Sequence, residues 1–193
     1  ATFPVSIRCS TATPLPTAYV ISRQKKRCLV VLGVAVVAAY ICLQGDAKMF
    51  FDMKKRTAAV KVSETDERVD FEVELDYKNV GKQEATLIDA YMRIYLPQEQ
   101  YDDVLLRGKV NLKGVLRDDD YFEAVLAPAG TGKTMVLRFE AYAKNGKTIA
   151  EALANVPDVD VALLVECRGR GALYTEKKYF TLTAEEMRKL VEK

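Results

Sequence analysis

Three residues have the pattern of a phosphate-binding site: Gly132, Lys133 and Thr134, which end the octapeptide APAGTGKT at 127–134. In a phosphate-binding loop, backbone N–H groups and the lysine hold the phosphates of a nucleotide. The loop must then lead into a helix, whose N-terminal N–H groups face the phosphates. Here residues 135–143 alternate apolar and polar, which is the period of a strand. We therefore predict a Gly-rich hairpin turn without a cofactor, and keep nucleotide binding through Ala127–Thr134 as the remote alternative.

Four carboxylates, Asp70, Glu72, Glu74 and Asp76, alternate with apolar residues in the segment VDFEVELDYK at 69–78. Two of them could act as a general acid and base if a pocket raised one pKa. On a strand, however, all four share one face, where pairing with Lys and Arg of neighbouring strands is usual. The acidic turn at 118–120 lacks the ligand spacing of a calcium loop. The carboxylates thus predict neither a catalytic site nor a metal site.

The composition excludes several classes of site. The chain of 193 residues contains no histidine, so histidine-based metal sites, triads and general bases cannot form within it. The four cysteines at 9, 28, 42 and 167 form no CxxC pair and no zinc spacing. We therefore predict a protein that is not an enzyme and that holds no metal and no disulfide framework.

Charge is distributed unevenly along the chain. Residues 1–56 contain nine Lys/Arg and two Asp, a balance of +7, and residues 57–193 contain 20 Lys/Arg and 25 Asp/Glu, a balance of −5. Nucleic-acid binding needs clustered positive charge on the folded part of a protein. The mildly acidic second part therefore argues against a nucleic-acid partner.

An apolar run of 16 residues follows a basic cluster at Arg23–Arg27. As a helix the run is about 24 Å long, slightly short of a bilayer core of roughly 30 Å. We predict that residues 23–45 form a transmembrane or signal-anchor helix in contact with membrane lipid. A cleaved signal peptide and a buried strand are the alternatives. The anchor residues are Cys28, Leu29, Val30, Val31, Leu32, Gly33, Val34, Ala35, Val36, Val37, Ala38, Ala39, Tyr40, Ile41, Cys42 and Leu43.

The segments on either side of the anchor complete the predicted topology. Residues 1–22, rich in Ser and Thr, are predicted as a flexible extension or targeting segment, and residues 46–56 as a juxtamembrane linker. Because positive flanking residues stay in the cytoplasm, the basic cluster predicts a single-pass protein with a cytoplasmic N-terminus and an extracytoplasmic domain.

Beyond residue 57 the pattern is that of strands. Apolar and polar residues alternate in short segments that are separated by turn residues, which is typical of a sandwich. We predict a mainly β protein with an antiparallel immunoglobulin-like β-sandwich of seven to eight strands at 57–183. A capping box at Thr183 and Glu186 predicts a short C-terminal helix at 184–193. The predicted strands are 59–62, 69–78, 85–96, 109–116, 121–126, 135–143, 159–167 and 173–182.

Three tyrosines on these strands are expected to point outward: Tyr91, Tyr95 and Tyr142. Exposed tyrosines are frequent in protein–protein interfaces. They form our candidate interaction face, with a covered edge or interface position as the alternative.

Residues 57–183 resemble the late-embryogenesis-abundant (LEA) type 2 domain, also called the water-stress-and-hypersensitive-response (WHy) domain. The resemblance rests on the strand ending Tyr77-Lys78-Asn79, the Ile88–Leu96 strand, and the loop 127–134 that leads into Val136–Tyr142. The Val159–Cys167 strand completes it. The family often has Asn-Pro-Asn where this chain has Asn79-Val80-Gly81. The resemblance implies a seven-stranded sandwich, often membrane-anchored, without known catalytic residues and with a stress-protective or structural role.

These observations together predict a membrane-anchored, non-enzymatic β-sandwich with a structural or protein-interaction role. It would be a subunit of an envelope or surface assembly, with protein partners or further copies of itself. The alternative is an LEA-like protective protein that acts without a dedicated partner.

Overall fold

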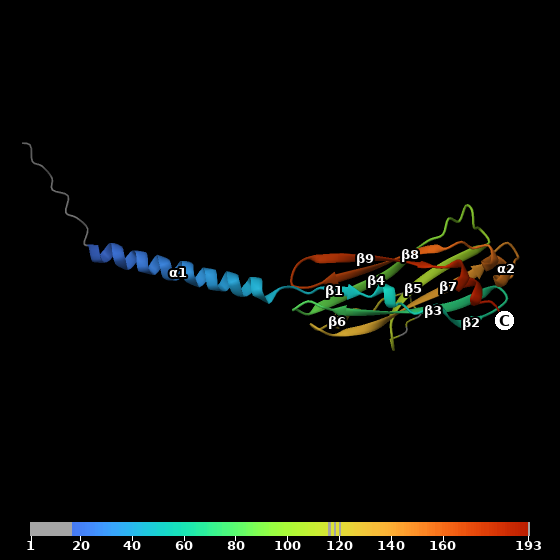
Figure 1. Cartoon of the computed structure of the whole chain (residues 1–193), viewed down its shortest axis with the longest axis horizontal. Helices are drawn as coiled ribbons and strands as arrows, with labels where there is room; N and C mark the ends of the chain where they lie inside the picture. The colour runs from blue at the N-terminus through green and yellow to red at the C-terminus, as the bar shows by residue number, and fades with distance from the viewer. Residues whose placement is uncertain (1–16, 116, 118, 120, 193) are drawn as a thin grey trace, which may run out of the picture. The chain divides into compact units, whose positions relative to one another are not determined.

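The computed structural model describes the backbone of residues 17–115, 117, 119 and 121–192, and the side chains from residue 24 onward. The described chain forms two compact units, the first ending at Gln44 and the second beginning at Gly45 (Figure 1). Residues 1–16 of the predicted N-terminal extension, and Asp118 and Asp120 of the acidic turn, lie outside the described residues.

The first unit contains a single helix, α1 (Thr17–Gln44). Its last 21 residues, Gln24–Gln44, are apolar enough to cross a membrane, and none of them is buried. Twenty-one helical residues extend about 32 Å, which matches a bilayer core of roughly 30 Å. The helix is longer than the apolar run because it includes the basic cluster and Gln44. The alternative of a buried strand is therefore wrong.

The second unit is a sandwich of two antiparallel sheets, so the predicted mainly β fold is confirmed. Nine strands form it, slightly more than the seven to eight predicted. Sheet A has the order β1-β3-β7-β5, with β2 also paired to β3, and sheet B has the order β6-β4-β8-β9. The strands are β1 (Met49–Phe51), β2 (Val60–Glu64), β3 (Arg68–Asn79), β4 (Ala85–Tyr95), β5 (Val104–Leu112), β6 (Val125–Ala127), β7 (Gly132–Ala143), β8 (Val159–Arg168) and β9 (Leu173–Leu182).

Strand β3 supplies the centre of the core. Its apolar residues, from Val69 to Tyr77, are buried between the sheets, as the alternation predicted. The Phe71 ring stacks on Phe139 of β7 with 5.0 Å between ring centroids. Phe139 in turn meets the edge of Phe180 on β9, with centroids 6.4 Å apart. This aromatic series joins sheet A to sheet B, and aromatic residues contribute large buried areas to such cores.

The segment 46–56, predicted as a linker, belongs to the folded domain. Strand β1 pairs with the end of β3, and both Met49 and Phe51 are only 3% exposed. The single-turn helix η1 (Met53–Lys55) follows. The prediction missed β1 because three residues are too few to establish a period, although the burial pattern in–out–in is that of a strand.

Two further predictions differ from the structure in detail. The predicted strand 121–126 is reduced to β6, which pairs only with residues 85–87 of β4. In β4, a bulge between Leu87 and Asp89 changes the face of the residues that follow. Because a bulge inserts one unpaired residue, Leu87 and Ala90 can both face the core.

Two short helices lie at the same end of the domain. They are α2 (Ile149–Ala154) and α3 (Ala184–Lys189). Each begins with a capping box in which a threonine and a glutamate satisfy one another's backbone N–H groups, at Thr148 and Glu151 in α2 and at Thr183 and Glu186 in α3. The predicted C-terminal helix is therefore confirmed, and it ends before the chain does.

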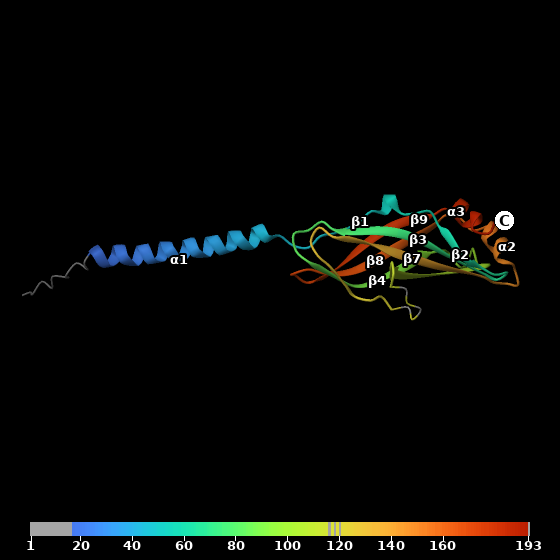
Figure 2. The ribbon, with the colours of Figure 1, turned by 90° about the horizontal axis from the view of Figure 1, so that it is seen from below.

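A bidentate ion pair joins the start of the domain to α3. The Arg56 guanidinium donates to both Glu186 oxygens, at 3.0 and 2.9 Å, and to the Thr181 carbonyl at 2.8 Å. Figure 2 shows η1, just before Arg56, on the same side of the domain as α3. The bonds from Arg56 hold the pKa of Glu186 below its ordinary value. Such charge-assisted pairs are stronger than neutral ones.

We expect Glu186→Gln to lower the free energy of unfolding by about 2 kcal/mol at pH 7. Glutamine keeps the capping box, so the loss isolates the ion pair. Because folding depresses the Glu186 pKa, the pair stabilises the domain above the unfolded pKa of about 4.3 and is lost as pH falls below it. Denaturation of both proteins at pH 7 and pH 3 checks this. A difference that persists at pH 3 would contradict the ionic origin.

Candidate interaction surface

The loop that resembles a phosphate site leads into a strand. Gly132, Lys133 and Thr134 begin β7 and pair with Lys78, Tyr77 and Asp76 of β3. The N–H groups of the loop are already engaged, because Gly130 donates to the Asn79 carbonyl at 2.8 Å and Thr131 to the Pro128 carbonyl at 3.1 Å. A phosphate cradle needs free N–H groups at a helix start. This loop is a turn between two strands, so it does not provide the N–H groups of a helix start.

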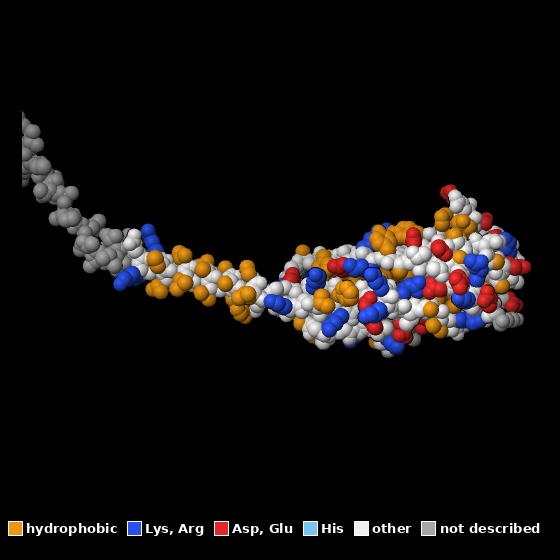
Figure 3. Space-filling view, viewed as in Figure 1, with side chains coloured by type: hydrophobic (Ala, Val, Ile, Leu, Met, Phe, Trp, Pro, Cys, Tyr) orange, Lys and Arg blue, Asp and Glu red, His pale blue; other side chains and the backbone are white. Residues whose placement is uncertain are grey.

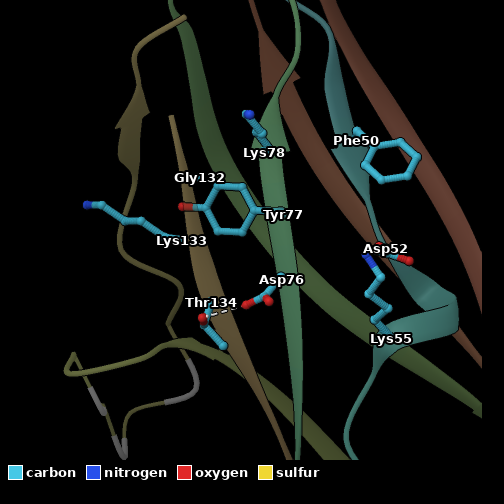
Figure 4. A pocket seen from close by; sticks show the side chains of 9 residues that line it. All are labelled: Phe50, Asp52, Lys55, Asp76, Tyr77, Lys78, Gly132, Lys133 and Thr134. Carbon is cyan, nitrogen blue, oxygen red and sulfur yellow. Dashed lines mark hydrogen bonds and ion pairs between the residues drawn. The ribbon is translucent and has the colours of Figure 1, made fainter. Parts of the chain in front are cut away.

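A groove of about 440 Å³ lies across β1, β3 and β7 beside this turn (Figure 4). Thr134 donates its hydroxyl proton to Asp76 at 2.6 Å, and Lys55 pairs with Asp52 at 3.2 Å. Figure 4 shows the Lys78 and Lys133 side chains extending in different directions. The cations therefore do not converge on one point, as the binding of a single phosphate would require.

The loop glycine has a structural reason. A Cβ on Gly132 would lie 2.4 Å from the Tyr77 carbonyl oxygen, which is backbone and cannot move without breaking the β3–β7 ladder. We expect Gly132→Ala to lower the free energy of unfolding by roughly 2 kcal/mol, and therefore to lower the melting temperature. Lys133→Ala, one residue on and exposed, is the control and should stay within about 0.5 kcal/mol. Melting curves with and without ATP check both, and an ATP-induced stabilisation that depends on Lys133 would contradict our interpretation.

Two carboxylates of the β3 row, Glu72 and Glu74, are paired with cations across the sheet, as predicted for the row. Arg138 of β7 donates to Glu72 at 3.0 Å, and Lys113, just beyond β5, donates to Glu74 at 2.8 Å. Asp70 accepts from Arg68 and Ser63. Burial acts to raise the pKa of Asp70, but these two hydrogen bonds outweigh it and hold the pKa below its ordinary value. A general acid would need a raised pKa, so this carboxylate is not poised as one.

The three predicted tyrosines do not form one face. Tyr142 lies on the outer side of sheet A, where the guanidinium groups of Arg68 and Arg107 sit 5.0 and 5.7 Å from its ring centre. Its hydroxyl donates to the buried carboxylate of Glu140 at 2.8 Å. Tyr91 and Tyr95 lie on β4, on the outer side of sheet B. Tyr142 is thus part of a charged cluster on the opposite face of the sandwich.

Tyr91 and Tyr95 belong to a different set of neighbours, which we call the tyrosine face. It lies on the outer side of sheet B and is built from cross-strand rows that run over β4, β8 and β9. Tyr95 and Tyr179 are 46% and 57% exposed and are the most prominent aromatic rings on it. The tyrosine face consists of Tyr91, Arg93, Tyr95, Asp160, Ala162, Leu164, Lys177, Tyr179 and Thr181.

The rows of the tyrosine face explain its chemistry. Leu164 lies between Tyr91 and Lys177, and Ala162 lies between Arg93 and Tyr179, so the long neighbours cover the two small apolar residues. The Lys177 ammonium sits 5.0 Å from the centre of the Tyr179 ring. The hydrogen bond with the Tyr179 hydroxyl raises the pKa of Lys177 above its ordinary value. Exposed tyrosine with adjacent arginine is the composition of protein-interface hot spots.

The sequence analysis missed Tyr179 and Lys177. The alternation of residues 173–182 already placed both on the side opposite the buried Phe180 and Leu182. The sequence does not reveal the order of the strands, in which β8 lies between β4 and β9 and so brings their outward residues onto one face.

Comparison with known proteins identifies no family for this chain. No family model matches the chain, and no curated protein matches it. The resemblance to the LEA type 2 domain therefore stays a prediction.

Solved structures provide matches of low similarity. A Bordetella pertussis structure assigned to the ApaA protein is 13% identical, with a TM-score of 0.44, over 71% of this chain and 94% of its own. The GAE domain of yeast GGA1 is 9% identical, with a TM-score of 0.35, over 69% of this chain and 90% of its own. The GAE domain of Saccharomyces cerevisiae GGA2p is 7% identical, with a TM-score of 0.29, over 65% of this chain and 97% of its own. Similarities of this size carry no argument about function.

Proposed function

We propose that this protein is a membrane-anchored, non-enzymatic β-sandwich that binds another protein through the tyrosine face. Helix α1 holds it in the membrane, and the domain at 45–193 carries the binding surface. The observation that carries the proposal is the tyrosine face itself: the half-exposed rings of Tyr95 and Tyr179 lie beside Arg93 and Lys177.

Two features support a binding surface over an active site. The outward carboxylates of β3 are engaged in pairs that hold the sheet together. The tyrosine face follows the strands of one sheet, and exposed aromatic anchors on such a surface suit a protein partner.

The membrane side is proposed from charge. Arg23–Arg27 precede the apolar segment, and the positive-inside rule then assigns the N-terminus to the cytoplasm and the domain to the other side. Protease added to intact cells should cleave the domain and spare the N-terminal segment. Digestion of the N-terminal segment alone would contradict this orientation.

A photo-crosslinking residue in place of Tyr179 tests the tyrosine face in the full chain, in the membrane of the producing cell. We expect one discrete crosslinked product, and we expect Arg93→Glu to abolish it because the charge at the partner is reversed. The same crosslinker at Tyr121, which is 63% exposed and lies in the loop before β6, is the matched control. Equal products from both positions, or none from Tyr179, would contradict the proposal.

A further inference from the structure

The two ends of the β domain carry opposite charge. One end holds Gly45, the β3–β4 turn, the loop 127–131 and the β8–β9 turn, as the strand registers require. The other end holds α2 and α3. Figure 3 shows acidic side chains gathered over the end with α2. The small net charge of the chain therefore conceals a separation along the strands.

Six cations and two carboxylates belong to the end that holds Gly45, which we call the basic end. The cations are Lys48, Lys78, Lys82, Lys133, Arg168 and Arg170, all exposed, and the carboxylates are Asp46 and Glu84. At the opposite end the described residues include eleven carboxylates and seven cations. The carboxylates are Glu64, Asp66, Glu67, Glu99, Asp102, Asp103, Glu151, Asp158, Glu185, Glu186 and Glu192, and the cations are Arg56, Lys61, Arg68, Lys144, Lys147, Arg188 and Lys189.

Most of the charge at the basic end is not neutralised within the domain. Over the described residues, no ion pair is formed by Lys48, Lys78, Lys133 or Arg168. Asp46 accepts hydrogen bonds from the backbone of Ala47 and Arg170. On the outer side of sheet A, by contrast, the cations pair with carboxylates across the strands.

Exposed apolar side chains accompany these cations. Phe50, Val80, Leu126 and Leu173 are each between 51% and 56% exposed, and each lies at the basic end or within a few residues of it. Lysine and arginine mixed with exposed apolar residues is the composition of surfaces that lie on lipid headgroups. A nucleic acid would be bound mainly through contacts between cations and phosphates, which require no exposed apolar residues.

Chain connectivity keeps the basic end close to any membrane that α1 spans. Gly45 directly follows the helix, and Lys48 lies four residues after Gln44, so at most about 14 Å of chain separates them. The β3–β4 turn packs on this segment, because Gly81 lies against the backbone of residues 46–48. Surface charge on a membrane acts over a Debye length of about 8–10 Å.

We propose that the basic end is a docking surface for the headgroups of an anionic bilayer, which holds the tyrosine face away from the membrane. The spread of Lys78 and Lys133 suits a charged surface better than a single phosphate. The inference rests on the proposed anchoring by α1. Because the strands run from the basic end to the end with α2, docking sets the sandwich upright on the lipid.

The test uses the full chain in nanodiscs of phosphatidylcholine, with or without about 30% phosphatidylglycerol. Cys9, Cys28 and Cys42 are replaced by serine, and buried Cys167 is retained because burial raises the pKa of its thiol to about 12 and keeps it unreactive. An environment-sensitive probe is attached at Val80→Cys, and a second protein carries it at Glu99→Cys at the opposite end.

We expect phosphatidylglycerol to shield the probe at position 80 severalfold from an aqueous quencher and to leave the probe at 99 unchanged. Shielding should disappear at about 1 M salt, where the Debye length is about 3 Å. Lys48→Gln, Lys78→Gln, Lys82→Gln and Lys133→Gln together should abolish it, since each cation changes membrane partition roughly fivefold. Lys144→Gln with Lys189→Gln, at the opposite end, is the control.

Several results would overturn the proposal. They are equal quenching in the two nanodiscs, shielding that survives in the four-glutamine protein, and shielding of the probe at 99. Duplex DNA that shields the probe at 80 in phosphatidylcholine discs would show a general polyanion site. If neither disc retains the protein, the proposed anchoring by α1 is wrong. Co-sedimentation with anionic vesicles then tests the docking surface separately. Binding that needs the four lysines supports the docking surface, and no binding overturns it.

Discussion

Replacing Asn79 by leucine should destabilise the domain more than any other single polar substitution described above. Asn79 is fully buried at the end of β3. Its side-chain oxygen accepts from the Lys48 and Gly81 N–H groups, at 3.2 and 2.9 Å. Its amide nitrogen donates to the Gln83 and Ala127 carbonyls, both at 2.8 Å. One side chain thus joins β1, the β3–β4 turn and the start of the glycine-rich loop.

Leucine has a similar volume and cannot form any of these bonds, so four backbone groups would lose their partner. Leaving a buried polar group unpaired costs about 1–3 kcal/mol, and water will reach some of the four. We expect a loss of about 4 kcal/mol and a fall in melting temperature of about 12 °C. Circular dichroism of the full chain in detergent measures both.

Asn111 offers the matched control. It is also buried, only 5% exposed on β5, but its amide nitrogen has no partner among the described residues. Asn111→Leu therefore removes no hydrogen bond donated by the amide nitrogen, and it should change the free energy of unfolding by less than about 1 kcal/mol. Equal losses from the two substitutions would show that amide burial, and not the bonds of Asn79, determines the effect.

Asn79 also shows which features of the fold could be predicted from the sequence alone. The alternation of 69–78 and the turn at 79–82 predicted the strand and its end, because period and turn chemistry are local properties. They could not predict that the Asn79 side chain would hold the loop at 127, because that contact spans 48 residues. The turn before β7 could be predicted because the residues after the phosphate-loop pattern have the period of a strand.

The candidate surfaces depend on strand order in the same way. Alternation assigned Tyr91 and Tyr142 each to an outward position, but only the topology shows that one lies on sheet B and the other on sheet A. The basic end could not be predicted either, because its cations come from four segments that are far apart in sequence. The net charge of residues 57–193 sums the charges of both ends and therefore does not reveal the basic end.

Lysine in the middle of α1 should release the protein from the membrane. Val34 and Val37 lie near the centre of the apolar segment and are 64% and 57% exposed. A lysine at the bilayer centre costs about 3 kcal/mol relative to valine, so Val34→Lys with Val37→Lys costs roughly 6 kcal/mol. We expect the double variant to be extracted by alkaline carbonate, which leaves the parent protein in the membrane fraction. The measurement is the share of the full-length chain in each fraction.

Gln24→Lys is the control, because a lysine at the helix end can extend its ammonium to the interface. It should stay in the membrane fraction like the parent. The reason for the large central effect lies in the helix surface: the apolar side chains from Leu29 to Leu43 are more than half exposed, and none of Gln24–Gln44 is buried by the described chain. We propose that lipid covers that area. If the double variant remains in the pellet, α1 is not what holds the protein in the membrane fraction. If the mature chain lacks the helix, the cleaved-signal alternative is correct.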